Sequence, residues 1–133
     1  MLAEIAAARG EQASATLRVN PDVDAGTHAK ISTGKKENKF GVAIDVAPDI
    51  YARLAKLEGL NLRGVAVHIG SQLQRLEPLE KCYARMGELV SQLRGAGHVI
   101  THVDLGGGLG VPYKPEDNPP SPAEYGAMVA RVT

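Results

Sequence analysis

The sequence predicts an α/β fold, and more specifically part of a (β/α)8 TIM barrel with about three βα units and a leading helix. Helical and strand-like segments alternate along the chain, which is typical of a parallel sheet covered by helices. Each predicted strand has one apolar face and one polar or small face. Both chain ends fall inside predicted helices, so we expect the 133 residues to be an internal segment of a barrel domain.

The first half of the chain contains two predicted helices and one strand. Residues 2–9 are rich in alanine and form a helix, which Gly10 ends as a C-cap. Residues 16–20 form a short strand that the following proline ends. Residues 21–45 form a long polar connection, and loops of this length are usually functional or mobile. A second helix is expected over 48–58, with a proline in its first turn.

The second half contains two further strands and two further helices. Residues 64–70 form the clearest strand of the chain. A third helix is expected over 75–94, where apolar residues at steps of three and four form one stripe. Residues 99–105 form the third strand. The sequence SPAE at 121–124 is a capping box with proline at the first helical position, so it opens the last helix.

Side-chain alternation places three polar residues on a common face of the predicted sheet. Arg18, His68 and Asp104 each oppose the apolar side chains of their own strand. In a barrel this face lines the interior, and catalytic groups gather at the C-terminal ends of the strands. A doubly covered open sheet has strands that are apolar on both faces. The pattern therefore favours a barrel, although open α/β sheets also carry functional groups at strand ends.

The composition argues against several classes of protein. The 15 basic and 15 acidic residues balance, whereas nucleic-acid-binding proteins usually carry a basic excess. No apolar run is long enough to span a bilayer, and 44% hydrophobic residues are typical of a soluble globular protein. The one cysteine, Cys82, suits a reducing cytoplasm, and its place beside an apolar stripe indicates a small core residue. His28, His98 and His102 lack partners at metal-ligand spacing, so no metal is expected.

A glycine run, GGGLG at 106–110, directly follows the third predicted strand. Glycine backbone N–H groups can converge on an anion such as a phosphate. The run does not match the dinucleotide pattern G-x-G-x-x-G, because position 111 is valine. Three alternatives stay open: the run is a flexible turn, His68 is a satisfied core residue, or Asp104 forms a structural ion pair with Arg18.

Three segments in this order resemble a known enzyme family. They are LRVNPDVDAGTHAKISTGKKENKFG at 17–41, GVAVHIGSQL at 64–73 and HVDLGGGLGVPY at 102–113. Over about residues 17–125 the chain resembles the bacterial diaminopimelate decarboxylases, which are fold-type III pyridoxal-phosphate enzymes with an alanine-racemase-like barrel. The resemblance implies pyridoxal 5'-phosphate as cofactor. For a complete enzyme it implies the decarboxylation of meso-2,6-diaminopimelate to L-lysine in the cytoplasm.

The resemblance also implies roles for seven residues of this chain. His68 would stack on the cofactor ring, Arg18 would lie near that ring, and Asp104 would support the glycine run. The cofactor phosphate would be held by Ser71 and by the backbone N–H groups of Gly106, Gly107 and Gly108. The mouth of the site would be bordered by His28, Lys30, Ser32, Thr33 and Lys39.

The resemblance places the chemical groups of the reaction outside this segment. In the family, the Schiff-base lysine lies upstream, and the acid at the pyridine nitrogen and the catalytic cysteine lie downstream. That cysteine belongs to a C-terminal β domain, which this segment does not include. We therefore assign no catalytic residue here and expect the isolated chain to be inactive. We also expect it to self-associate through uncovered strand edges and helix faces. A complete enzyme is expected to be a homodimer that binds an amino-acid substrate but neither nucleic acid nor membrane.

Two other functions stay open at this stage. The first is a related pyridoxal-phosphate decarboxylase of arginine, ornithine or carboxynorspermidine, because most substrate-selecting residues lie outside the segment. The second is a non-catalytic α/β phosphate-binding scaffold, which the missing lysine favours if the chain is complete.

Overall fold

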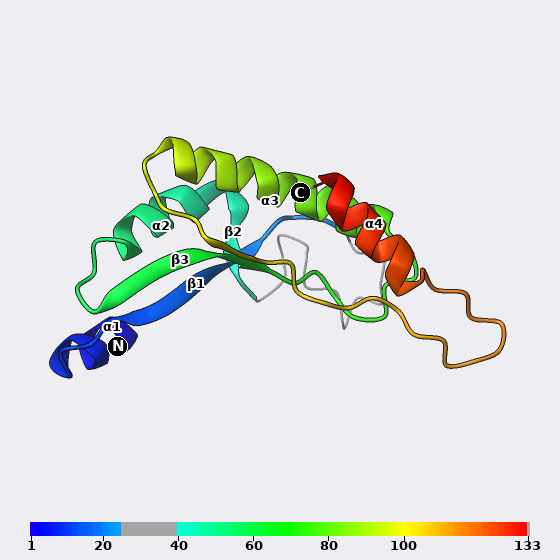
Figure 1. Cartoon of the computed structure of the whole chain (residues 1–133), viewed down its shortest axis with the longest axis horizontal. Coiled ribbons are helices and arrows are strands. Elements are labelled where there is room, and N and C mark those ends of the chain that lie inside the picture. The colour runs from blue at the N-terminus through cyan, green and yellow to red at the C-terminus, as the bar shows by residue number, and fades with distance from the viewer. Residues whose placement is uncertain (25–39, 133) are drawn as a thin grey trace.

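The computed structural model describes residues 1–24 and 40–132 and contains alternating helices and parallel strands (Figure 1). The predicted order of helices and strands is confirmed, with two short additional elements before the second predicted helix. Within these residues no helix is long and apolar enough to cross a membrane. In chain order the elements are α1 (Leu2–Ala8), β1 (Ala13–Asn20), β2 (Val42–Ala43), the 3-10 helix η1 (Ile44–Val46), α2 (Ala47–Leu54), β3 (Leu60–Val67), α3 (Glu77–Gly95), β4 (His102–Asp104) and α4 (Pro122–Val132).

Four parallel strands form one sheet in the order β2-β1-β3-β4. Helices α2, α3 and α4 lie together on one face of this sheet (Figure 1). Helix α1 lies beside the N-terminal ends of β1 and β3. It packs so closely there that a side chain at Gly59 would collide with the backbone of Ala3 and Ala7. The predicted α/β fold with a parallel sheet is therefore confirmed.

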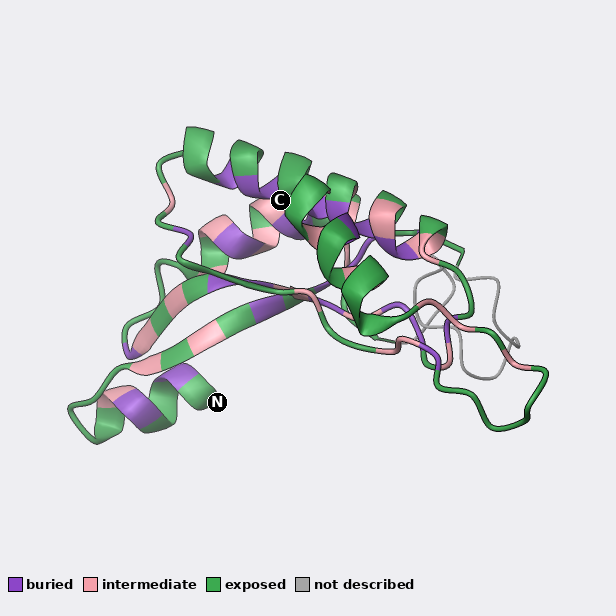
Figure 2. Ribbon diagram, turned by 45° about the vertical axis from the view of Figure 1, so that its right-hand side comes forward, coloured by how far each residue is buried: buried purple, intermediate pink, exposed green. Residues whose placement is uncertain are grey.

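The core lies between the sheet and the helices that cover it (Figure 2). Leu17, Val19, Val65 and Val67 are buried, which confirms the predicted apolar face of the first two strands. Burial of each large apolar side chain stabilises the fold by about 1.5–3 kcal/mol. Helix α3 contributes the largest share of the opposing surface, with Leu79, Cys82, Tyr83, Met86, Leu89, Val90 and Leu93.

Cys82 is fully buried in this core. Burial raises the pKa of its thiol to about 12, so the thiolate is scarce at neutral pH. Both observations confirm its interpretation as a small core residue rather than a nucleophile.

Several predicted boundaries differ from the structure. Strand β1 begins at Ala13 rather than at residue 16, because its first three residues pair with Leu60–Leu62 of β3. Strand β4 covers only His102–Asp104 rather than 99–105, since only these residues are in register with β3. The expected connection 21–45 ends in β2 and in most of η1, and β2 forms because Val42 and Ala43 pair with the end of β1.

One further prediction about the strands is corrected by the structure. Strand β3 ends at Val67, so His68 lies just beyond the strand rather than inside it. Asn20, the last residue of β1, is polar and yet buried. Its side-chain oxygen accepts a hydrogen bond from the backbone N–H of Asp22 at 2.9 Å. This local bond gives the side-chain oxygen a partner, which lowers the cost of burying it.

Candidate functional site

Polar residues from three neighbouring strands meet at the C-terminal end of the sheet. Ala66 of β3 is the register partner of Arg18 on one side and of Asp104 on the other. His68 follows two residues after Ala66 and is half-buried. The polar face predicted from alternation is therefore continuous from β1 to β4. It lies opposite the face that α2, α3 and α4 cover (Figure 1).

Arg18 and Asp104 have separate partners on this face. The Arg18 guanidinium lies 5.5 Å from the centroid of the Phe40 ring, a cation–π contact. An Asp104 carboxylate oxygen accepts the backbone N–H of Gly106 at 2.8 Å. In the described part of the chain, the structural ion pair between Arg18 and Asp104 is not formed. Asp104 instead holds the first glycine of the run.

The glycine run crosses directly over the end of β3. Gly106 and Gly108 have φ angles of +71° and +104°, in the region that favours glycine. A side-chain carbon at Gly106 would collide with the carbonyl oxygen of Val67, and one at Gly108 with that of Gly70. The protein's own backbone therefore requires glycine at both positions.

Gly107 is different from its two neighbours. Its φ angle lies outside the left-handed region, and a side-chain carbon there would meet no atom within 4 Å. Among the residues that the structure describes, nothing requires glycine at this position. A glycine that no internal contact explains, exposed at the end of a sheet, is consistent with a ligand that approaches the backbone closely.

The backbone N–H groups of the run differ in availability. That of Gly106 is paired with Asp104, and that of Gly107 lies 3.4 Å from Nδ1 of His68, which is a long and weak hydrogen bond. The N–H of Gly108 makes no hydrogen bond with the residues described. Gly108, with a smaller contribution from Gly107, is thus the donor best placed to bind an anion.

Ser71 lies beside Gly108. A side-chain carbon added at Gly108 would come 3.4 Å from Cα of Ser71. Ser71 is exposed, and its hydroxyl has no hydrogen-bond partner among residues 1–24 and 40–132. The hydroxyl and the Gly108 N–H are therefore donors of two neighbouring residues, and both are available to a ligand such as a phosphate.

The turn that carries Ser71 is joined to the glycine run by backbone hydrogen bonds. The N–H of Leu73 donates to the carbonyl of Gly108 at 2.8 Å, and the N–H of Gly110 donates to the carbonyl of Leu73 at 2.9 Å. These bonds form a parallel bridge between Leu73 and Leu109. His68, Ser71 and the glycines are brought together in this way.

Gln72, the residue after Ser71, was not predicted to belong to the site. Its side-chain oxygen accepts the N–H of Val111 at 2.8 Å, and its side-chain nitrogen donates to the carbonyl of Val111 at 3.3 Å. Its φ angle is +57°, which is unusual for a residue other than glycine. Gln72 belongs to the quoted segment at 64–73, but nothing in that segment indicates a partner 39 positions away.

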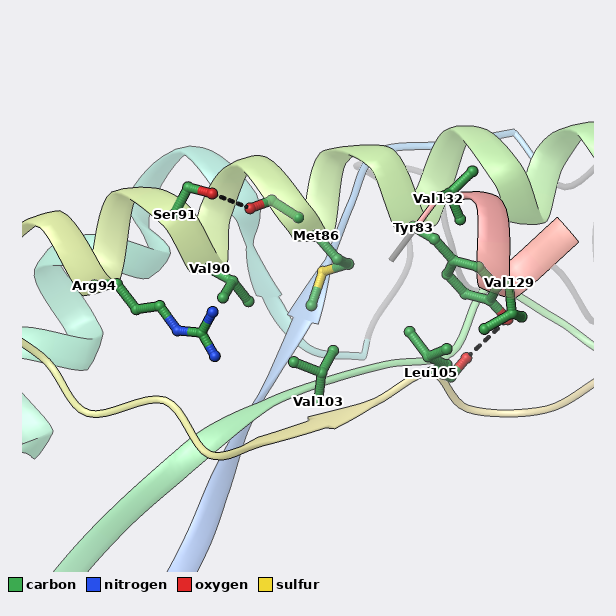
Figure 3. Close-up of a pocket in the computed structure, with 10 residues that line it drawn as sticks. Tyr83, Met86, Val90, Ser91, Arg94, Val103, Leu105, Val129 and Val132 are labelled. Atoms are coloured by element: carbon green, nitrogen blue, oxygen red, sulfur yellow. Dashed lines mark hydrogen bonds between the residues drawn. The ribbon is translucent and has the colours of Figure 1, made fainter.

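Tyr83, which belongs to the apolar stripe of α3, also makes a polar contact next to the glycine run. Its hydroxyl donates to the carbonyl of Leu105 at 3.1 Å, directly before the glycine run (Figure 3). The Tyr125 hydroxyl lies 2.9 Å from that of Tyr83 and must donate to it, because Tyr83 has one proton. Burial, with Tyr125 adding to the effect, raises the pKa of Tyr83, so its hydroxyl stays protonated. Helices α3 and α4 thereby hold the end of β4.

An apolar groove of about 500 Å³ lies between α3, β4 and α4 (Figure 3). Val103 and Leu105 line it together with residues of both helices. These two residues alternate with His102 and Asp104, so the groove is on the helix side of the sheet. It is therefore separate from the face that carries His68 and Asp104.

The predicted mouth of the site is outside the described residues. His28, Lys30, Ser32, Thr33 and Lys39 all belong to 25–39, so their expected positions stay predictions.

Known proteins are similar to this chain over most of its length. Residues 1–132 match the family described as "Pyridoxal-dependent decarboxylase, pyridoxal binding domain". The diaminopimelate decarboxylase of Zymomonas mobilis is 50% identical over 134 residues, which cover 100% of this chain and 32% of that protein. The diaminopimelate decarboxylase of Pseudomonas aeruginosa is 55% identical over 124 residues, which cover 93% of this chain and 30% of that protein. The chain spans about a third of the length of these relatives.

Solved structures show the same architecture. The crystal structure of diaminopimelate decarboxylase from Helicobacter pylori, complexed with L-lysine, superposes with a TM-score of 0.91 and is 36% identical. The match covers 97% of this chain and 32% of that one. The similarity confirms that the sheet and its helices are part of a (β/α)8 barrel.

Proposed function

Because the chain belongs to the family of pyridoxal-binding domains of pyridoxal-dependent decarboxylases, we propose that it is an internal barrel segment of a diaminopimelate decarboxylase. The complete enzyme would convert meso-2,6-diaminopimelate to L-lysine and carbon dioxide. The observation that carries the proposal is the 50% identity to the Zymomonas mobilis enzyme across the whole segment. The Helicobacter pylori relative was crystallised with L-lysine, the product that this reaction would release.

The residues present fit pyridoxal phosphate. The cofactor has a phosphate group and a flat aromatic ring. The Gly108 N–H and the Ser71 hydroxyl are adjacent donors without partners among the described residues, and Gly107 leaves open space beside them. His68 lies against this run through the N–H of Gly107, so its imidazole is close enough to form one wall for the ring. The donors and the ring wall match the two parts of the cofactor.

The proposed roles follow from these positions. When bound, pyridoxal phosphate accepts into its ring the negative charge that loss of carbon dioxide leaves on the substrate. Ser71 and the N–H groups of Gly107 and Gly108 would bind the phosphate, and His68 would orient the ring. Asp104 would act through Gly106, whose N–H it holds. Arg18, on the same face, would lie near the ring.

We propose that the covalent lysine belongs to another part of the enzyme. The described lysines, Lys56, Lys81 and Lys114, lie in a turn, a helix and a loop, and none is on a strand of the sheet. The isolated chain should therefore bind pyridoxal phosphate weakly and in competition with inorganic phosphate. Borohydride reduction followed by mass spectrometry should give no stoichiometric adduct. A full adduct at one lysine would contradict this assignment.

The association state of the chain is also part of the proposal. Strand β4 is at one edge of the sheet, and the groove beside it is lined by Val103, Leu105, Val129 and Val132. Exposed strand edges and apolar grooves favour association. We expect the isolated chain to self-associate in sedimentation experiments, and a concentration-independent monomer would contradict this. The complete enzyme is proposed to be a cytoplasmic homodimer.

The test of the function uses the complete protein encoded by the reading frame that contains this chain. The purified protein with pyridoxal phosphate should release carbon dioxide and L-lysine from meso-2,6-diaminopimelate. Arginine, ornithine and carboxynorspermidine should give far lower kcat/KM. Higher turnover of one of these would identify a related decarboxylase. Cofactor binding without turnover of any of them would identify a phosphate-binding scaffold.

A matched pair of serine variants tests the proposed site. S71A should weaken the affinity for pyridoxal phosphate by about tenfold, the usual effect of losing one hydrogen bond to a charged group. S91A removes a serine hydroxyl of α3 that bonds to the carbonyl of Gly87 beside the apolar groove, which is on the other face of the sheet from the glycine run. It should leave the cofactor affinity unchanged. Equal affinities for S71A and S91A would remove Ser71 from the site.

A further inference from the structure

We propose that Gln72 is a positioning residue that sets the distance between the Ser71 hydroxyl and the N–H groups of the glycine run. The identity of the ligand, a phosphate ester, rests on the proposed function. The role of Gln72 itself rests on its own contacts.

The side chain of Gln72 joins the turn after β3 to the end of the glycine run, and we call this connection the clamp. Its amide oxygen accepts the N–H of Val111 at 2.8 Å, and its amide nitrogen donates to the carbonyl of the same residue at 3.3 Å. A primary amide that meets both backbone groups of one residue is held in position and orientation together. Val111 directly follows the last glycine of the run, so the clamp acts on the run itself.

The backbone of Gln72 is in an unfavourable conformation. Its φ angle of +57° is in the left-handed region, where a long side chain is disfavoured relative to glycine. Such conformations persist only where surrounding contacts determine them, and they cluster at ligand sites. Since a glycine would avoid this strain, the presence of glutamine indicates that its side chain has a task.

The clamp complements the backbone bonds of Leu73. Leu73 joins the turn to Gly108 and Gly110, while Gln72 joins it to Val111. Loss of the Gln72 side chain leaves the Leu73 bonds in place, so the fold should survive. The turn would then pivot about Leu73, and Ser71 would move relative to Gly108. Displacements of about 1 Å are enough to weaken a preorganised site strongly.

The variant that separates these effects is Q72G, made in the complete protein. Glycine accepts the left-handed backbone, so the melting temperature should stay within about 3 °C of the wild type or rise. The dissociation constant for pyridoxal phosphate should increase about tenfold. The constant for pyridoxal, which has no phosphate, should change less than twofold. A purely structural role would lower the melting temperature and weaken both ligands together.

Two further variants make the result specific. Q72N tolerates a left-handed backbone but is one methylene shorter, so it should behave like Q72G toward pyridoxal phosphate. Q92A removes an exposed glutamine of α3 and should leave both ligands and the melting temperature unchanged. The inference is overturned if Q72G binds pyridoxal phosphate like the wild type, or if it weakens pyridoxal equally. A wild-type protein that binds neither pyridoxal phosphate nor inorganic phosphate would overturn the proposed function as well.

Discussion

The two faces of the one parallel sheet are held by different kinds of contact. On the face toward α2, α3 and α4, Val19, Val65 and Val67 are at most 2% exposed and pack among apolar side chains. On the other face, Arg18 and Asp104 are exposed and contact Phe40 and the glycine run. Packing explains the residues of the first face. The binding proposed above would explain the second, where Ser71 and Gly107 have no contact within residues 1–24 and 40–132 that requires them.

The largest difference between the two faces should appear in stability. M86A removes most of a side chain that is 1% exposed in the core and should lower the free energy of unfolding by about 2–5 kcal/mol. S71A, in the exposed turn after β3, should change the free energy of unfolding by less than about 0.5 kcal/mol. Urea unfolding of both variants measures this difference. Similar losses of unfolding free energy in the two variants would mean that Ser71 is packed as tightly as Met86 in the core.

Gly107 and Gly108 are neighbours in the glycine run, but substitutions at the two positions should have different effects. G108A forces a side chain into the left-handed region and against the carbonyl of Gly70, so it should destabilise the protein by about 2–4 kcal/mol. G107A meets no neighbouring atom and should leave the unfolding free energy nearly unchanged while weakening pyridoxal phosphate binding. Thermal unfolding and cofactor titration together check this. If G107A bound the cofactor normally, its glycine would need another explanation.

A smaller effect on stability is expected at Tyr83, whose hydrogen bond to the carbonyl of Leu105 joins α3 to the start of the glycine run. Y83F leaves the carbonyl of Leu105 without its donor and should cost about 1–2 kcal/mol. Y125F leaves that bond in place and should cost less. Because Leu105 directly precedes the glycine run, Y83F should also weaken cofactor binding more than Y125F. The reverse order of the two variants would contradict the assigned direction of the hydrogen bonds.

The smallest effect is expected at the start of α4, outside both faces. The Glu124 carboxylate accepts bonds from the N–H and hydroxyl of Ser121 at 2.8 and 2.7 Å, which confirms the predicted capping box. The backbone bond, then the hydroxyl bond, lowers the pKa of Glu124 below its ordinary value. The carboxylate's contribution to stability is therefore present above the ordinary glutamate pKa and is lost as the pH falls through the lowered value.

The variant S121A tests this cap. It should cost about 1 kcal/mol near pH 7, because the N-cap side chain is lost. The difference from wild type should shrink in acid, where Glu124 is protonated in both proteins. NMR titration should show the pKa of Glu124 moving up toward its ordinary value in S121A. Because the backbone N–H of residue 121 stays in place, an unchanged pKa would show that the Ser121 hydroxyl does not contribute to holding this carboxylate.

Local patterns predicted the parts of the molecule that depend on near neighbours. Alternation placed Arg18 and Asp104 on one face, and the stripe of α3 faces the core as its spacing predicts. The strand β2 was missed, because two residues carry no pattern and are strand only through their partners Val19 and Asn20.

The sequence by itself determined which segments are helix or strand and which side of each strand is apolar, because these properties follow from spacings of two to four residues. Tertiary structure decided the register that aligns Arg18, Ala66 and Asp104 across three strands. It also decided the close passage of the glycine run over Val67 and Gly70, and the bonds from Gln72 to Val111. Those contacts join positions about 39 residues apart, and no local pattern specifies where two such segments meet.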